Sequence, residues 1–165
     1  MPVLLRQVAL GVGVVLLQWL VFLRLPLWDV VPDVVLLYVA LQALQYGRVT
    51  GAIAGFGAGL LMDVVLFATT GAPLGLNAML KTLMGFVIGL FRSDQGDKMR
   101  IDPIQAFIGA FVIAVVHNGL LTILKALDLD TRNLFLIFGV WIGASLYTAV
   151  VALVASLFRT RTGRL

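Results

Sequence analysis

Apolar residues fill six stretches of this 165-residue chain, and short polar or proline-containing segments separate them. A membrane-spanning helix needs about 20 mostly apolar residues, and the strict alternation that indicates strands is absent from the sequence. We therefore predict an all-α integral membrane protein, with one bundle of six transmembrane helices in a single domain over residues 1–165. The expected helices cover residues 3–23, 29–46, 48–67, 76–91, 103–127 and 134–158.

The second expected helix is the least regular of the six. Pro32 suits the first turn of a helix, where its missing N–H is not needed, and Asp33 then lies beside the positive end of the helix dipole. Counted from Asp33 the helix is short for a span, and the segment from Asp29 gives it sufficient length. If it does not cross, five spans place the termini on opposite sides. Pro73 and Gly75 mark the turn before the fourth helix.

Small residues recur at four-residue intervals, which places them on one face of a helix. Gly51, Gly55 and Gly59 form such a face, and Asp63 continues it. The same spacing recurs at Asn77, Lys81, Gly85 and Gly89, at Ala106, Ala110 and Ala114, and at Gly139 and Gly143. Backbones approach closely where side chains are small. These faces therefore serve either the packing of the bundle or the docking of another membrane protein.

Composition and charge place the chain in lipid. Hydrophobic residues make up 61% and charged residues 12%, with a mean hydropathy of +1.08, against about 45–50% and 25% in soluble domains. With no cysteine and one histidine, we expect no disulfide, no metal site and no cofactor. Eight basic residues fall on the side of the termini and three on the other: Arg6, Arg48, Arg92, Lys98, Arg100, Arg159, Arg161 and Arg164 against Arg24, Lys125 and Arg132. The positive-inside rule then predicts that both termini are cytoplasmic.

Two groups of polar residues fall within apolar stretches. Asp63 and Lys81 have similar depths on adjacent helices, so we expect an ion pair or a short hydrogen-bonded link between them. The alternatives are separate interfacial positions, with Lys81 extended toward the membrane surface, or a transport or binding site. His117 and Asn118, near the middle of the fifth helix, indicate a hydrogen bond to a neighbouring helix more than a proton relay, because no carboxylate lies near them in sequence.

No arrangement of residues typical of catalysis is found. Ser93, Ser145 and Ser156 have no histidine at a suitable depth, and Asp63 is the one carboxylate expected within the bilayer. We therefore expect a protein that is not an enzyme. The shortage of intramembrane acids also disfavours an ion or proton channel.

The chain resembles the rod shape-determining protein MreD family over nearly its whole length, and most specifically in its middle third. The resemblance rests on Pro32-Asp33, on Gly47-Arg48, on the run from Gly59-Leu60-Leu61-Met62-Asp63 through Pro73-Leu74-Gly75-Leu76-Asn77, and on Lys81-Thr82-Leu83-Met84-Gly85-Phe86. It implies a multi-pass, non-catalytic subunit of the bacterial elongation machinery in the inner membrane. It also implies partnership with MreC, with RodA and its penicillin-binding protein, and indirectly with the MreB filament. The implied role is in peptidoglycan synthesis and rod cell shape, and the implied fold is similar to the six-helix substrate-binding subunit of energy-coupling-factor transporters.

The alternative function is a small-molecule (vitamin-type) binding subunit of a membrane transporter. Such a protein needs an outward pocket with convergent polar or aromatic groups. The candidates for these groups are Trp28, Tyr38, Gln42, Asn77, Lys81 and Asn118. A co-purifying vitamin favours this alternative, and a co-purifying single-pass protein favours the scaffold.

Overall fold

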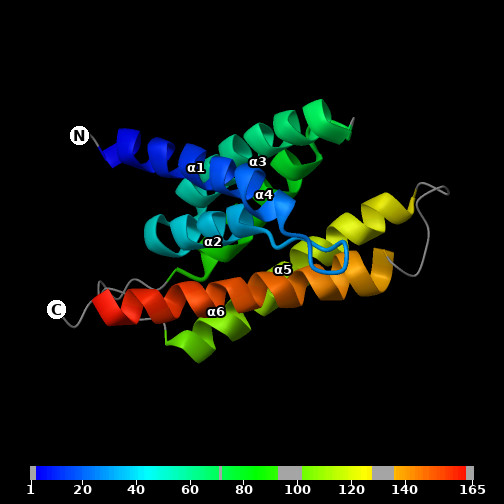
Figure 1. The fold of residues 1–165 in the computed structure, drawn as a ribbon. Helices are drawn as coiled ribbons and strands as arrows, with labels where there is room; N and C mark the ends of the chain where they lie inside the picture. Colours follow the sequence, from blue (N-terminus) through cyan, green and yellow to red (C-terminus); the bar gives the residue numbers. More distant parts are fainter. Residues whose placement is uncertain (1–2, 71, 93–101, 128–135, 163–165) are drawn as a thin grey trace. The chain divides into compact units, whose positions relative to one another are not determined.

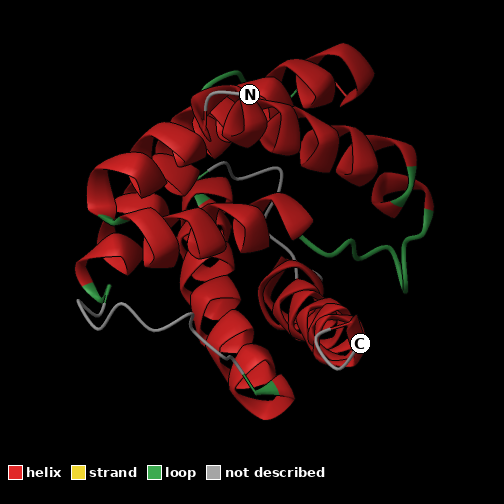
Figure 2. Ribbon diagram, turned by 90° about the vertical axis from the view of Figure 1, so that its left-hand side faces the viewer, coloured by secondary structure: helices red, strands yellow, loops and turns green. Residues whose placement is uncertain are grey.

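The structure, a computed structural model, describes residues 3–70, 72–92, 102–127 and 136–162. These residues are helical apart from short connections and one isolated β-bridge, which confirms the all-α prediction for this part of the chain (Figure 2). The elements in order are α1 (Val3–Leu20), the 3-10 helix η1 (Phe22–Arg24), α2 (Val34–Tyr46), α3 (Arg48–Thr70), α4 (Leu76–Leu90), α5 (Pro103–Ala126), the π-helix η3 (Leu136–Gly143) and α6 (Ala144–Thr162) (Figure 1).

Four helical segments among the described residues are long and apolar enough to cross a membrane: Leu5–Arg24, Arg48–Thr70, Pro103–Ala126 and Ile137–Phe158. Helices α2 and α4 are also apolar but have only 13 and 15 residues. At about 1.5 Å per residue they are about 20 and 22 Å long, less than the hydrocarbon thickness of about 30 Å.

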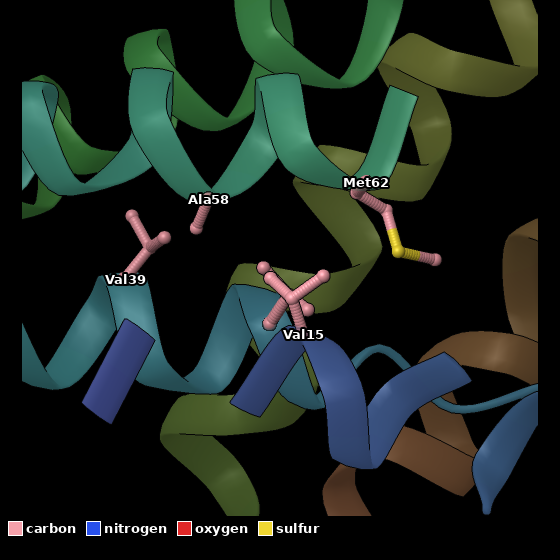
Figure 3. Packing of buried hydrophobic residues seen from close by; sticks show 5 residues of the cluster. Val15, Val39, Ala58 and Met62 are labelled. Carbon is pink, nitrogen blue, oxygen red and sulfur yellow. The ribbon is translucent and has the colours of Figure 1, made fainter. Parts of the chain in front are cut away.

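The chain forms two compact units. The N-terminal unit comprises Met1–Leu25 and Val34–Asp94. Its apolar core joins three helices: Val15 of α1, Val35 and Val39 of α2, and Ala58 and Met62 of α3 (Figure 3). These buried side chains form the apolar contact between the three helices, and protein interiors of this kind are close-packed.

Polar contacts attach α1 to α2 within this unit. Gly11 leaves space for the ring of Tyr38, whose hydroxyl donates to the carbonyl oxygen of Gln7 at 2.9 Å. Buried Gln18 accepts the amide of Val34, the first residue of α2, at 2.9 Å. Three polar or small residues of the first helix, Gln7, Gly11 and Gln18, therefore contact protein.

The prediction of a second helix over residues 29–46 is wrong at its start. Leu27 and Val30 exchange both backbone hydrogen bonds, at 2.9 and 3.0 Å, around Trp28 and Asp29, which have φ of 51° and 61°. Residue Val31 precedes a proline and is disfavoured in the α region. The helix therefore begins only at Val34, directly after Pro32 and Asp33.

The other helix ends differ from the predictions by a few residues. Helix α3 continues to Thr70 instead of 67, and the hydroxyls of Thr69 and Thr70 donate to carbonyls of its last turn. Helices α4 and α5 end one residue early, at Leu90 and Ala126. Residues 134 and 135 of the sixth predicted helix lie outside the described part of the chain.

The C-terminal unit comprises Pro26–Asp33 and Gln95–Leu165. Helices α5 and α6 lie side by side and run antiparallel (Figure 1). The sixth helix begins as a π-helix over Leu136–Gly143, and α6 then extends to Thr162 instead of 158. The amide of Asp33 donates to Thr148 of α6 at 2.9 Å, which fastens the 26–33 segment to this unit.

Candidate functional site

Helices α3 and α4 pack against each other through their glycines, and we call Gly51, Gly55, Gly59, Gly85 and Gly89 the glycine interface. Gly51 lies against the backbone of Gly85, Gly55 against Lys81, Gly59 against Ala78, and Gly89 against Arg48. These pairings run in opposite directions along the two helices, so the helices are antiparallel neighbours. All five glycines are buried.

A side chain does not fit at these positions. A Cβ on Gly59 would lie 2.6 Å from the Cα of Ala78, and on Gly51 it would lie 2.6 Å from the Cβ of Ala43 in α2. On Gly55, Gly85 and Gly89 it would collide with the backbone of the facing helix. The space beside these five glycines, which were predicted for helix packing or partner docking, is thus occupied by other helices of the same chain. The glycines therefore offer no surface to another protein.

Asp63 ends the glycine face of α3 and binds the amino end of α4. Its side chain is 1% exposed. Oδ2 accepts the amides of Gly75 at 3.1 Å and Ala78 at 2.9 Å, while Oδ1 accepts the amide of Asn77 at 3.0 Å and its Nδ2 at 3.0 Å. A helix begins with amides that have no partner within the helix. Here a carboxylate from another helix accepts them, at the positive end of the helix dipole.

The sequence around Gly75 explains why the cap comes from another helix. Gly75 is the residue before α4 and has φ of 96°, in the left-handed region that glycine adopts readily. Glycine has no side chain with which to accept the first amides, a task that Ser, Thr, Asp or Asn commonly performs at this position. Pro73 lies in the exposed connection before it.

Asn77 links Asp63 to Lys81. Lys81 is 1% exposed, and its Nζ donates to Oδ1 of Asn77 at 3.2 Å, while Nδ2 of the same amide donates to Asp63. We call Asp63, Gly75, Asn77, Ala78 and Lys81 the Asp63 network. The expected short hydrogen-bonded link between Asp63 and Lys81 is present, with Asn77 between them, and neither charged group is at an interfacial position exposed to solvent.

A second polar group joins α5 to α6. Nδ2 of Asn118 donates to Oγ of Ser145 at 3.1 Å, and Nδ1 of His117 lies 3.1 Å from Oδ1 of Asn118. Ser145 in turn donates to the carbonyl of Trp141 at 2.5 Å. His117 and Asn118 are 1% and 4% exposed. Asn118 therefore makes the predicted hydrogen bond to a neighbouring helix, and His117 contacts Asn118 on the same helix.

The sequence did not predict three residues that complete this contact, Gly119, Trp141 and Ser145. The indole N–H of Trp141 donates to the carbonyl of Val115 at 3.0 Å, and a Cβ on Gly119 would lie 3.1 Å from that nitrogen. In the sequence, Ser145 stands out only as a serine without a histidine at a suitable depth. Gly119, one residue after the polar pair, is the available signal that a large side chain from another helix approaches there.

The remaining small residues are less tightly packed than the glycine interface. On α5, Ala110 and Ala114 are buried and Ala106 is partly exposed. Gly139 is partly exposed in η3, and a Cβ on Gly143 would lie 3.3 Å from the carbonyl oxygen of Phe138 and 3.5 Å from Cγ2 of Val30, farther than the contacts of the glycine interface.

The described residues form no metal site. They contain no group of three His, Cys, Asp or Glu side chains in reach of one ion. The buried polar atoms of the two polar groups are instead directed at backbone amides, carbonyls and each other.

No protein-family model matches this chain, and the searches among curated proteins and among solved structures also gave no match. The interpretation of the site therefore depends on the geometry above. That geometry consists of two buried polar groups, each of which holds a pair of helices together.

Four of the six groups predicted for a small-molecule pocket form hydrogen bonds with other residues of the chain. Asn77 and Lys81 belong to the Asp63 network, Tyr38 bonds to α1, and Asn118 bonds to Ser145. Trp28 is 95% exposed. Gln42 of α2 is buried, and its carbonyl oxygen has no hydrogen-bond partner among the described residues.

The Asn118–Ser145 contact can be measured by a double-mutant cycle. We expect the Asn118→Ala and Ser145→Ala changes to couple by about 0.6–1 kcal/mol in the free energy of unfolding, the range for hydrogen bonds between membrane helices. A control cycle of Asn118→Ala with Ser156→Ala should show no coupling, since Ser156 bonds to Leu153 of its own helix. Equal coupling in the two cycles would contradict this assignment.

Proposed function

We propose that this protein is a non-catalytic scaffold subunit of the bacterial elongation machinery, as its resemblance to the MreD family implies. In this proposal it lies in the inner membrane, binds MreC, and supports peptidoglycan synthesis by RodA and its penicillin-binding protein. The observation that carries the proposal is the Asp63 network. Its members Asp63, Gly75, Asn77 and Lys81 are among the residues on which the resemblance rests, and they are bonded to one another at the α3–α4 contact.

A scaffold has to keep its shape when a partner binds, and the site geometry fits that requirement. The polar groups of the Asp63 network are directed at the α3–α4 contact and satisfy each other there. The glycine interface brings the two backbones together over most of the length of α4. Such an arrangement gives a rigid helical pair whose outer faces are available to a partner helix.

The proposal includes six membrane segments with both termini in the cytoplasm. Helices α2 and α4 are short for a span, so nonhelical residues complete each crossing: residues 30–33 before α2 and residues 72–75 before α4. Nonhelical backbone is tolerated at membrane depth where protein covers it. Buried Pro32 and the Asp63 hydrogen bonds to Gly75 and Asn77 are in accord with this requirement.

The lipid-facing side of α3 and α4 is where we expect the transmembrane helix of MreC. Ile53 and Phe56 of α3 and Met79 and Leu83 of α4 are apolar and 67%, 55%, 54% and 47% exposed. Photo-crosslinking residues placed singly at these four positions in rod-shaped cells should capture MreC from at least one of them. Position 112 of α5, where Val112 is 55% exposed, is the matched control on another exposed helix.

The result also discriminates the two functions. Capture of MreC from α3 or α4, above the level from position 112, supports the scaffold. If none of the positions captures MreC and a vitamin co-purifies with the protein, the scaffold role is wrong and the transporter subunit takes its place. In that case the side-chain oxygen of Gln42, which has no hydrogen-bond partner among the described residues, is the first group to test for ligand contact.

A further inference from the structure

Three helix ends line an open cavity in the N-terminal unit, at the opposite end of α3 and α4 from the Asp63 network. It has a volume of about 530 Å³ and is lined by Tyr46, Gly47, Arg48, Val49, Gly89, Leu90 and Arg92. These residues close α2, open α3 and close α4. The volume lies within the range of small-molecule sites, about 300–1,000 Å³.

Two arginines give this cavity a positive charge. Arg48 and Arg92 are exposed, and neither forms an ion pair with another described residue. One guanidinium nitrogen of Arg92 lies 3.3 Å from the point where a Cβ on Gly47 would be. The side chain of Arg92 therefore extends across Gly47 toward the start of α3. Gly47 has φ of 90°, and its lack of a side chain keeps that path open.

The backbone adds donors to the same cavity. The first hydrogen bond within α3 runs from the amide of Gly51 to the carbonyl of Gly47, at 2.9 Å. The amides of Arg48 and Val49 come before Gly51 in the chain, and they have no acceptor among the described residues. Free amides and the helix dipole favour an anion at such a helix start. The carboxyl ends of α2 and α4 contribute partial negative charges there, about −0.5 each, which the two guanidinium groups exceed.

We propose that this cavity binds the phosphate group of an anionic lipid headgroup, held between Arg48 and Arg92. Arginine pairs with phosphate through two parallel N–H donors, a geometry suited to this ligand. Val49 and Leu90 line the same cavity and are 64% and 53% exposed, which provides apolar surface for the acyl chains of the lipid. The charge distribution of the chain assigns this end to the cytoplasmic leaflet. The inference depends on the membrane location alone and not on the partner proposed above.

The test is a titration of the purified full chain in neutral detergent with short-chain phosphatidylglycerol, phosphatidylcholine or inorganic phosphate, read by native mass spectrometry. The variants are the double change R48Q/R92Q and the control Arg6→Gln. Arg6 is exposed on the same side of the membrane by charge count and does not line the cavity. Circular dichroism checks that each variant keeps its helix content.

We expect phosphatidylglycerol to bind the unmodified chain at least about tenfold more tightly than phosphatidylcholine. R48Q/R92Q should remove most of that preference, and Arg6→Gln should change it less than about twofold. An equal loss in both variants would mean that surface charge alone attracts the lipid, which overturns the site. Binding of inorganic phosphate as tight as that of phosphatidylglycerol would overturn the lipid as the source of the phosphate.

Discussion

Replacing Gly55 by leucine should separate α3 from α4. A side chain at this position collides with the backbone carbonyl group of Lys81, and backbone cannot move aside as a flexible side chain can. Overpacking of this kind typically costs about 1–3 kcal/mol in the free energy of unfolding, and we expect the upper end of that range here because the obstacle is backbone. The measurement is reversible unfolding in mixed micelles at increasing fractions of SDS, followed by circular dichroism.

Gly57 provides the matched control on the same helix. It is exposed, and a Cβ there has no atom within 4 Å. Gly57→Leu should leave the free energy of unfolding within about 1 kcal/mol of the original or raise it, because a helix interior disfavours glycine by about 1 kcal/mol. If Gly55→Leu and Gly57→Leu are equally tolerated, the close contact of the two backbones is wrong.

Replacing Asp63 by asparagine should lower the free energy of unfolding by about 2–3 kcal/mol, because it leaves a buried donor unsatisfied. Both carboxylate oxygens accept backbone amides, so the Nδ2 group of asparagine would face at least one N–H and leave it without an acceptor. A buried donor of this kind costs about 1–3 kcal/mol, and the loss of negative charge at the start of α4 adds to this. The same SDS unfolding assay measures the effect.

Asp29→Asn is the control for this change. Asp29 is exposed and has φ of 61°, a conformation that asparagine adopts as readily as aspartate. We expect a change of less than about 0.5 kcal/mol. An Asp63→Asn protein as stable as Asp29→Asn would show that the hydrogen bonds to α4 contribute little.

Four-residue spacing is sufficient to predict that Gly51, Gly55, Gly59 and Asp63 share one buried face of α3. Residues on one helical face are fixed by the helix repeat alone, so Gly51, Gly55 and Gly59 can be assigned to one side of a helix without knowing what they contact. Whether that side faces another helix of the same chain or a partner depends on tertiary structure. The spacing cannot discriminate between these two possibilities.

The amino end of α4 shows why the site is only partly predictable. A cap is expected from the residue that precedes the helix, and Gly75 cannot provide one. The acceptor comes from Asp63, on another helix, and no local rule connects these positions. The start of α2 differs from its prediction for a related reason: its first amide is accepted by Gln18 of α1, and Trp28 and Asp29 adopt a turn that favours Asn-Gly pairs.

The dependence of α4 on Asp63 has a consequence for how the chain enters the bilayer during synthesis. In the six-span arrangement that we propose, α4 alone would carry a lysine into the hydrocarbon, at a cost of about 2.5–3.5 kcal/mol, together with unsatisfied amides at its start. With α3 beside it, the amides have acceptors and the ammonium group has a hydrogen-bond partner. We therefore expect the translocon to release α3 and α4 into the bilayer together, as one helical hairpin. In nascent chains that end before Leu90, we expect α4 to remain in the aqueous channel of the translocon.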